Sequence, residues 1–332
     1  MARRRLTQQQ KQRIQAIQQR RREKLDERAE ACLDNADEST PLKGRIIVRH
    51  GATLGVESAE GEVTQCLTRQ NIGHAVCGDR VIWHRTGNSG GVVTALQPRS
   101  SVLSRPDYSG RDKPLAANLT QLVVVVAPKP PPAGFLLDQY LVSAETIGVK
   151  PLIAVNKIDL LEGEEAQRFL ARLARYKAID YAMAQVSAKK EHGLDELVEH
   201  LKGETSILVG QSGVGKSSLI NALLPDHEVE TGRLSETTGH GRHTTSAATL
   251  YHLPQGGDLI DSPGVRSFRL TNLTRQMLEQ GFPEFRPYLG RCRFHNCSHH
   301  HEPECAIRAA VENGRISALR LESFHRLAGN TK

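Results

Sequence analysis

The sequence contains no hydrophobic run long enough to cross a bilayer. Its longest apolar stretch covers residues 122–127 (LVVVVA), whereas a membrane-spanning helix needs about 20 apolar residues. Residues 1–28 contain arginine and glutamine where a secretory signal would have an apolar segment. We therefore expect a soluble, cytoplasmic protein that does not bind membranes.

Cysteine is scarce and unevenly distributed. The chain has six cysteines, and without a secretion signal a disulfide framework is not expected. Three of them, Cys292, Cys297 and Cys305, fall within 14 residues. This clustering requires another explanation, which a metal site can provide.

Excess charge is absent from most of the chain. The net charge is +7, and residues 1–30 account for +6 of it, with 10 basic and 4 acidic residues. Such a run is either a solvated or disordered tail or an arm that binds a polyanion, and one segment can be both. We treat residues 1–40 as a basic N-terminal extension.

A length of 332 residues favours two or three domains. Between residues 44 and 97, four β-rich runs (RIIVRH, EVTQCLT, DRVIWHR and GVVTALQ) are separated by turn residues that include Gly55, which predicts a small antiparallel barrel in residues 41–99. Aromatic residues are scarce there, essentially Trp83. Any contact of this domain with RNA would therefore rely on backbone and charge.

From about residue 118, apolar runs alternate with amphipathic stretches. This pattern predicts an α/β domain with a parallel sheet and helices on its faces, in residues 100–269. Residues 270–332 indicate helical segments around the cysteine cluster, which form a third, C-terminal metal-binding domain. We find no internal repeat.

A phosphate-binding loop follows the apolar strand SILVG and precedes the helix SSLINALL. Its glycines let backbone N–H groups converge on phosphates, Lys216 brings charge to the β and γ oxygens, and Ser217 offers a hydroxyl to magnesium. The residues expected to bind nucleotide here are Gly210, Gln211, Ser212, Gly213, Val214, Gly215, Lys216 and Ser217.

Two further loops predict that the base is guanine. The run Asn156, Lys157, Ile158, Asp159 ends the strand PLIAVN, and its carboxylate can accept the N1–H and 2-amino protons that adenine does not present. The run Ser187, Ala188, Lys189 follows the strand YAMAQVS. A backbone N–H in that loop would face the base oxygen.

The residues expected around the γ-phosphate lie after the phosphate loop. Asp261 ends the run DLI and suits a carboxylate that holds magnesium through water, and Gly264 would meet the γ-phosphate. In the polar loop 237–245, Thr244 or Thr245 is expected to reach the metal. Val265 stands where Ras-type enzymes have a water-orienting glutamine, so intrinsic hydrolysis should be slow. His243 is our candidate for positioning water, and the alternative is a group from the partner.

The order of these motifs is permuted. Asn156 precedes Gly210 by 54 residues, whereas ordinary GTPases have the phosphate loop first. A sheet can keep its strand neighbours when the old termini are joined and the chain is cut elsewhere. The segment after Asp261 then leads directly into the C-terminal domain, and we expect contacts of Gly264 with the γ-phosphate to be transmitted there.

The cysteine cluster has the composition of a structural zinc site. Cys292, Cys297 and Cys305 with His299 supply three thiolates and one imidazole, which leaves no open coordination position. His295, His300 and His301 compete as the fourth ligand, and spacing alone does not choose among them.

Three motifs occur in the order NKID, GQSGVGKSS and DSPG, and the run C-x₄-C-x-H-x₅-C follows them. In these features the chain resembles the ribosome small subunit-dependent GTPase A family over nearly its whole length. The resemblance implies an OB-type barrel, a permuted GTPase domain and a zinc domain. It also implies that GTP hydrolysis is stimulated by the small ribosomal subunit, whose late maturation the protein assists. It selects His299 as the zinc ligand and extends the GTP-binding run to Ser218.

Two functions compete at this point. The first is a GTPase that couples hydrolysis of GTP to GDP and phosphate to its arrival at and release from subunits. The second is a GTP-gated rRNA-binding assembly factor in which hydrolysis only resets binding, and Val265 supports it. A metabolic kinase would need neither the NKID run nor the basic arm. We expect GTP or GDP, the small subunit and its rRNA as partners, one zinc, magnesium with GTP, and a monomer.

Overall fold

The computed structural model describes residues 40–329 apart from 52, 70–71, 87–89, 108–110, 133–134, 226–247 and 263–272. The chain forms two compact units, Met1–Arg99 with Ala247–Thr249, and Ser100–Ser246 with Leu250–Lys332. The basic arm lies outside the described residues. So do His243, Thr244, Thr245, Gly264 and Val265.

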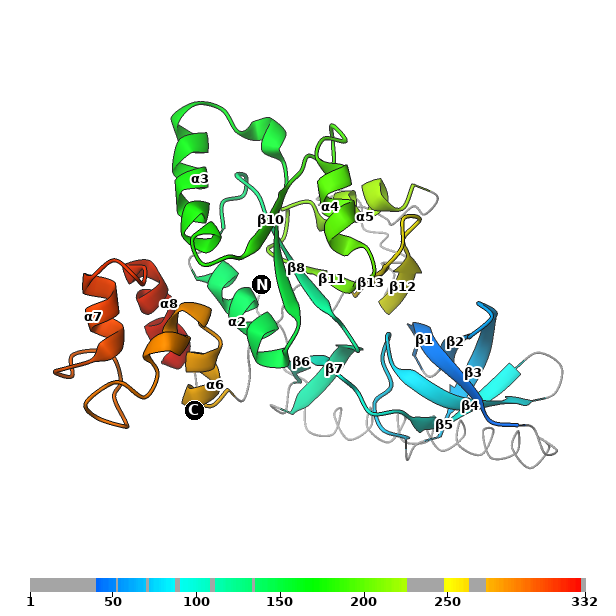
Figure 1. Cartoon of the computed structure of the whole chain (residues 1–332). Helices are drawn as coiled ribbons and strands as arrows, with labels where there is room; N and C mark the ends of the chain where they lie inside the picture. The colour runs from blue at the N-terminus through cyan, green and yellow to red at the C-terminus, as the bar shows by residue number, and fades with distance from the viewer. Residues whose placement is uncertain are drawn as a thin grey trace, which may run out of the picture. The chain divides into compact units, whose positions relative to one another are not determined.

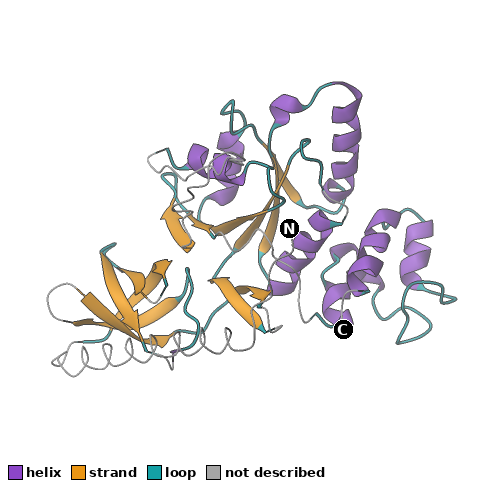
Figure 2. Ribbon diagram, turned by 180° about the vertical axis from the view of Figure 1, so that it is seen from behind, coloured by secondary structure: helices purple, strands orange, loops and turns teal. Residues whose placement is uncertain are grey.

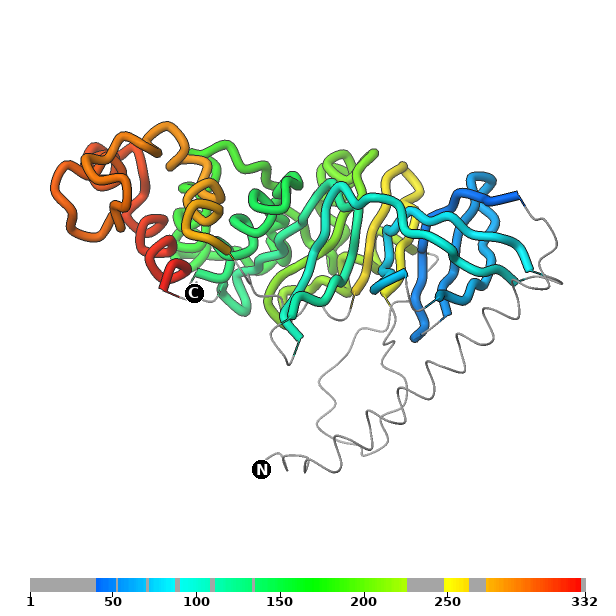
Figure 3. Tube along the Cα trace, turned by 90° about the horizontal axis from the view of Figure 1, so that it is seen from below, coloured from blue at the N-terminus to red at the C-terminus, as the bar shows by residue number. Residues whose placement is uncertain are grey.

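The first unit contains a closed barrel, as the sequence predicts. Its strands pair in the order β1-β2-β3-β5-β4, and β4 also pairs with β1, which closes the ring (Figure 3). Buried Ile46, Val56, Val81 and Trp83 fill its interior. The strands are β1 (Leu42–His50), β2 (Thr53–Ser58), β3 (Val63–Thr68), β4 (Arg80–Thr86) and β5 (Gly90–Leu96).

The barrel differs from the expectation in two ways. The expected barrel is antiparallel, but the pair β3–β5 is parallel. Because β4 lies between β5 and β1, β5 is the strand that pairs with β3. The sequence pattern also missed β2, since Gly55 resembled a turn residue. Gly55 instead lies where a Cβ atom would come within 2.4 Å of Val48 Cγ1, so a glycine allows β1 and β2 to approach closely.

The second unit is built on a sheet with the strand order β10-β9-β8-β11-β13-β12. The pairs β10–β9, β9–β8, β8–β11 and β11–β13 are parallel, which confirms the predicted α/β class. A separate hairpin, β6 (Val102–Pro106) with β7 (Asp112–Ala117), was not predicted. The sheet strands are β8 (Gln121–Val126), β9 (Lys150–Val155), β10 (Ala182–Gln185), β11 (Thr205–Val209), β12 (Ala248–His252) and β13 (Asp258–Asp261).

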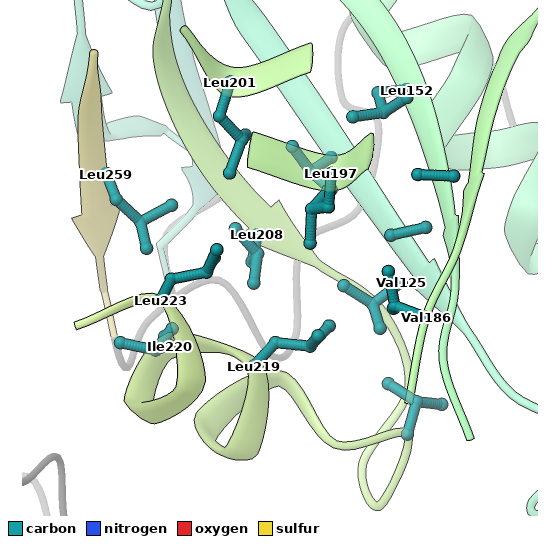
Figure 4. Close-up of a cluster of buried hydrophobic side chains, with 14 of the residues drawn as sticks. Val125, Leu152, Val186, Leu197, Leu201, Leu208, Leu219, Ile220, Leu223 and Leu259 are labelled. Atoms are coloured by element: carbon teal, nitrogen blue, oxygen red, sulfur yellow. The ribbon is translucent and has the colours of Figure 1, made fainter. Parts of the chain in front are cut away.

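Helices pack on both faces of this sheet (Figures 1 and 2). On one face, α4 (Leu194–Leu201) and α5 (Lys216–Leu223) bury leucines against alternate residues of the strands, such as Val125 and Leu208 (Figure 4). On the other face, α2 (Leu136–Ile147) contacts β8 and β9. The helix α3 (Gly163–Lys177) connects β9 to β10. The continuous apolar run of β8 is thus explained by burial on both faces.

The C-terminal residues of this unit form short helices around an aromatic core. Phe282, Phe285 and Phe324 meet with ring centroids 4.9 to 5.7 Å apart. The elements are α6 (Arg275–Gln280), the 3-10 helix η4 (Pro283–Tyr288), α7 (Ala306–Glu312) and α8 (Ala318–Ala328). Among the described residues, no helix has both the length and the apolar character needed to cross a membrane.

Candidate nucleotide site and metal centre

The phosphate loop joins β11 to α5 at the carboxyl end of the strand between β8 and β13. Gly210, Gly213 and Gly215 have φ values of 142°, 83° and 96°, which side-chain-bearing residues rarely adopt. A Cβ atom on Gly210 would lie 2.4 Å from the carbonyl oxygen of Val125, and one on Gly215 would lie 2.3 Å from Asn156 Nδ2. The loop shape therefore requires glycine at both positions.

Lys216 begins α5 and folds back over the loop. Its Nζ donates to the carbonyl oxygens of Gly210 (2.7 Å) and Gln211 (2.9 Å). The ammonium group is thus held at the opening of the loop, where the helix N-terminus also favours negative charge. Ser212, Gly213 and Ser218 are exposed.

Asn156 joins three of the predicted motifs. It is 1% exposed at the end of β9, and its Nδ2 donates to the carbonyl oxygen of Val214 (2.9 Å) in the phosphate loop. Its Oδ1 accepts from the backbone N–H of Ala188 (3.2 Å). One amide side chain therefore sets the spacing between the phosphate loop and both base-side loops.

Lys157 supports the same loop from the other side. It has a left-handed backbone (φ 62°), and its Nζ donates to the carbonyl oxygens of Gly213 (2.6 Å) and Lys129 (2.9 Å). Sequence reasoning missed Lys129. This residue contributes its backbone carbonyl, which every residue type has, so the sequence holds no signal for the contact. The stem of Lys157 lies beside the phosphate loop, since a Cβ atom on Gly215 would lie 3.7 Å from Lys157 Cε.

The carboxylate of Asp159 is oriented by Ser187. The Ser187 hydroxyl donates to Asp159 Oδ1 (2.5 Å), and Ser187 Oγ accepts from the N–H of Lys190 (3.2 Å). The same loop pairs Ser187 with His192. Ile158 lies between Lys157 and Asp159 in the chain, and Lys189 is exposed. This arrangement leaves the second oxygen of Asp159 to accept protons from a base.

Ser217 and Asp261 are the described candidates for magnesium. Ser217 lies in the first turn of α5, and Asp261 ends β13, which runs beside β11. Both are half-buried, and hydroxyl and carboxylate oxygens are the donors that magnesium prefers. The donor set fits the metal.

Tyr140 is a residue near the phosphate loop that sequence reasoning missed. Burial raises the pKa of this tyrosine, although a hydrogen bond with the backbone of Gly210 acts in the opposite direction. Its ring, on α2, lines a small cavity together with Gly210 and Gln211. No local sequence signal identifies it, because the contact joins two motifs that are 70 residues apart.

The four predicted zinc ligands lie together. Their ligand atoms are all within 4.8 Å of one another, with Cys292 Sγ 3.9 Å from Cys305 Sγ and His299 Nδ1 3.3 Å from Cys305 Sγ. A tetrahedral zinc with Zn–S bonds of about 2.3 Å requires S···S edges of about 3.8 Å. Cys292, Cys297, His299 and Cys305 therefore fit zinc in both chemistry and spacing.

Further contacts hold these ligands in place. His299 Nε2 lies 3.3 Å from Glu279 Oε1, which also accepts from Arg275 Nε (2.9 Å). Burial of Glu279 raises its pKa, but the hydrogen bonds from His299 and Arg275 outweigh burial and leave the pKa lowered. A carboxylate behind a histidine that presents Nδ1 to three sulfurs is a common second layer of zinc sites.

Comparison with known proteins agrees with these features. The family model for the RsgA GTPase matches residues 96–271. The "Small ribosomal subunit biogenesis GTPase RsgA" of Hahella chejuensis is 46% identical over 98% of this chain and 96% of its own length.

Two solved structures are also similar. YjeQ from Thermotoga maritima is 30% identical with a TM-score of 0.73, over 88% of this chain and 98% of that one. YloQ, described as a circularly permuted GTPase, is 28% identical with a TM-score of 0.69, over 88% of this chain and 95% of that one. The resemblance drawn from the motif order and the predicted fold class are confirmed, and the chain belongs to the RsgA GTPase family.

Proposed function

We propose that this protein hydrolyses GTP to GDP and phosphate at the small ribosomal subunit, where it acts in late maturation and is stimulated by the subunit. The single observation that carries the GTPase chemistry is the placement of Asn156, which bonds the phosphate loop and the base-side loop at once. The name of the 46% identical relative supports the subunit as partner.

The proposed mechanism assigns each part of the site a task. Asp159 binds the guanine edge while Ser187 holds it in position, so adenine would leave a polar group unpaired. The N–H groups of the phosphate loop and Lys216 bind the phosphates. Ser217 and Asp261 would hold magnesium, which when bound neutralises charge that develops on the β and γ oxygens.

The remaining assignments are part of the same proposal. Residues 100–269 are the GTPase domain, residues 41–99 the barrel domain, and residues 270–332 a domain that one structural zinc holds together. Gly264 would contact the γ-phosphate, Thr244 or Thr245 would reach the metal, and His243 would position water. We further propose that the protein binds rRNA, works as a monomer and is located in the cytoplasm, where small subunits mature.

The test is phosphate release from GTP by the full chain, alone and with small subunits, with large subunits and ATP as controls. Strong stimulation by small subunits alone supports the proposal. Lys216→Ala or Ser217→Ala should then block release from subunits. If subunit binding instead depends on GTP occupancy but not on turnover, the protein is a GTP-gated rRNA-binding factor whose hydrolysis only resets binding.

A further inference from the structure

A cavity of about 350 Å³ is lined by residues from the start of α2, from α3 and from α8, and Figure 1 shows these three helices. Phe135, Phe169 and Leu319 form apolar parts of its wall. Ligand sites in proteins have volumes of about 300–1,000 Å³. In the described part of the chain, its lining includes neither the nucleotide loops nor the four metal ligands.

Three arginines give this cavity a positive mouth. Arg172 and Arg175 come from α3, and Arg326 comes from α8. Arg326 pairs with Glu322 (2.6 Å), and Arg175 Nε donates to the carbonyl oxygen of Arg172 (2.8 Å). Among the described residues, the exposed guanidinium of Arg172 has no carboxylate partner.

Two acids also line the cavity, and each already binds an arginine. Asp138 binds Arg320 and Glu322 binds Arg326, both at 2.6 Å, which leaves Arg172 and Arg175 without a carboxylate partner among the described residues. The cavity therefore presents guanidinium N–H groups to an incoming anion, and guanidinium pairs well with phosphate oxygens.

Aromatic rings lie near two of these arginines. The guanidinium of Arg326 is 5.8 Å from the ring centre of Phe135, and that of Arg175 is 5.7 Å from Tyr176. Nucleobases stack on aromatic rings and on guanidinium planes, while neighbouring guanidiniums bind the phosphate. An acidic peptide would use the charges but would gain nothing from the rings.

We propose that this cavity binds a nucleotide unit, with its phosphate on Arg172, Arg175 and Arg326 and its base against Phe135. The unit is either a free nucleotide or an unpaired nucleotide of an RNA chain, which offer the same chemistry. Only the RNA source rests on the proposed function. The occupant would contact α3 and α8 together and so stabilise the packing of the C-terminal helices on the GTPase part.

The test is a calorimetric titration of the full chain saturated with GDP, so that the guanine site is filled. The two probes are cytidine monophosphate and a short single-stranded oligocytidylate. Arg172→Ala and Arg326→Ala should each weaken binding by about tenfold, since each removes one charged contact to phosphate. The salt slope of RNA binding should also fall by about one for each variant.

Arg168→Ala is the matched control, because Arg168 lies on α3, pairs with Glu164 at 3.0 Å and does not line the cavity. It should leave both affinities unchanged. Leu319→Trp, which fills the mouth from an exposed position, should weaken both probes without removing a charge.

If only the monophosphate binds, the occupant of the cavity is a free nucleotide. If only the oligonucleotide binds, the occupant is a nucleotide of an RNA chain. The proposal is overturned if neither probe binds, if the arginine variants bind both probes as the wild type does, or if a glutamate-rich peptide binds at these arginines more tightly. Phosphate release with small subunits is measured on the same preparations. Loss of stimulation there would refute the proposed function and leave the monophosphate result standing.

Discussion

Arg320 in α8 and Asp138 in α2 form an ion pair with a contact of 2.6 Å across 182 residues of sequence, and both side chains are buried. Glu284 binds the same guanidinium at 2.6 and 3.1 Å. Ser323 and Tyr176 donate to Asp138 as well. The C-terminal helices are thus attached to α2 by a network in which one cation satisfies two carboxylates.

Arg320→Ala should therefore destabilise the second unit strongly. It leaves two buried carboxylates without their cation, and breaking a buried pair in this way costs about 3–5 kcal/mol. Urea unfolding followed by circular dichroism measures the change, because the only tryptophan, Trp83, lies in the barrel of the first unit. Arg168→Ala, which breaks an exposed pair with Glu164, should cost less than about 1 kcal/mol. Equal effects of the two variants would contradict the role of the network.

Asp159→Asn should weaken GTP binding and improve binding of xanthosine triphosphate. The amide cannot accept both protons of guanine, and an unpaired polar group costs about 1–3 kcal/mol, or roughly 5- to 150-fold in affinity. Titration with fluorescent analogues of both nucleotides measures it. Asp180→Asn is the control, since Asp180 has φ 61° and asparagine tolerates that conformation. Unchanged GTP affinity of Asp159→Asn would refute our assignment of the base site.

His299→Ala should lower the zinc content of the purified protein below one ion per chain and unfold the C-terminal helices, because Cys297 and Cys305 are part of their buried core. His300→Ala should keep the zinc. Metal analysis and circular dichroism, with and without a chelator, distinguish the variants. Loss of zinc from His300→Ala alone would mean that the wrong histidine has been assigned.

Gly55→Ala should destabilise the barrel by about 1–3 kcal/mol, the usual cost of overpacking, because the new methyl group would lie 2.4 Å from Val48 Cγ1. Gly90→Ala is the matched change in β5, where the nearest atom is 3.5 Å away. Thermal unfolding monitored through Trp83, which is fully buried in the barrel, measures both. A barrel equally stable with either alanine would show that β1 and β2 can separate without cost.

Motifs that act through neighbouring residues could be predicted from the sequence. The run from β11 through Gly210 to α5 was recognisable because glycine spacing, the lysine and the flanking apolar pattern are all local. The fold class followed from alternating strand and helix patterns for the same reason. The four candidate metal ligands were proposed from residue type and spacing, and the structure brings them together. The choice of His299 over its neighbours needed the family resemblance, and in the structure Glu279 lies behind it.

Features that depend on contacts between distant segments could not be predicted. Strand β2 was missed because a glycine is favoured both in turns and where strands approach closely, and only the position of Val48 distinguishes the cases. Lys129 accepts from Lys157 through its backbone carbonyl, and Tyr140 contacts the backbone of Gly210, so neither contact leaves a residue-type signal. The pairing of Arg320 with Asp138 depends on how two helices pack, which no periodicity encodes.

The permuted order also determines when the nucleotide site can exist during translation. Strands β8, β9 and β10 leave the ribosome before β11, so Asn156, Asp159 and Ser187 are synthesised while their phosphate loop is still missing. β11 can pair with β8, and its loop can accept the hydrogen bond from Asn156, only after β11 has also been synthesised. The order of synthesis therefore places the base-side residues before the phosphate loop, so that GTP can bind with all its contacts, and stabilise the fold, only when the sheet is nearly complete.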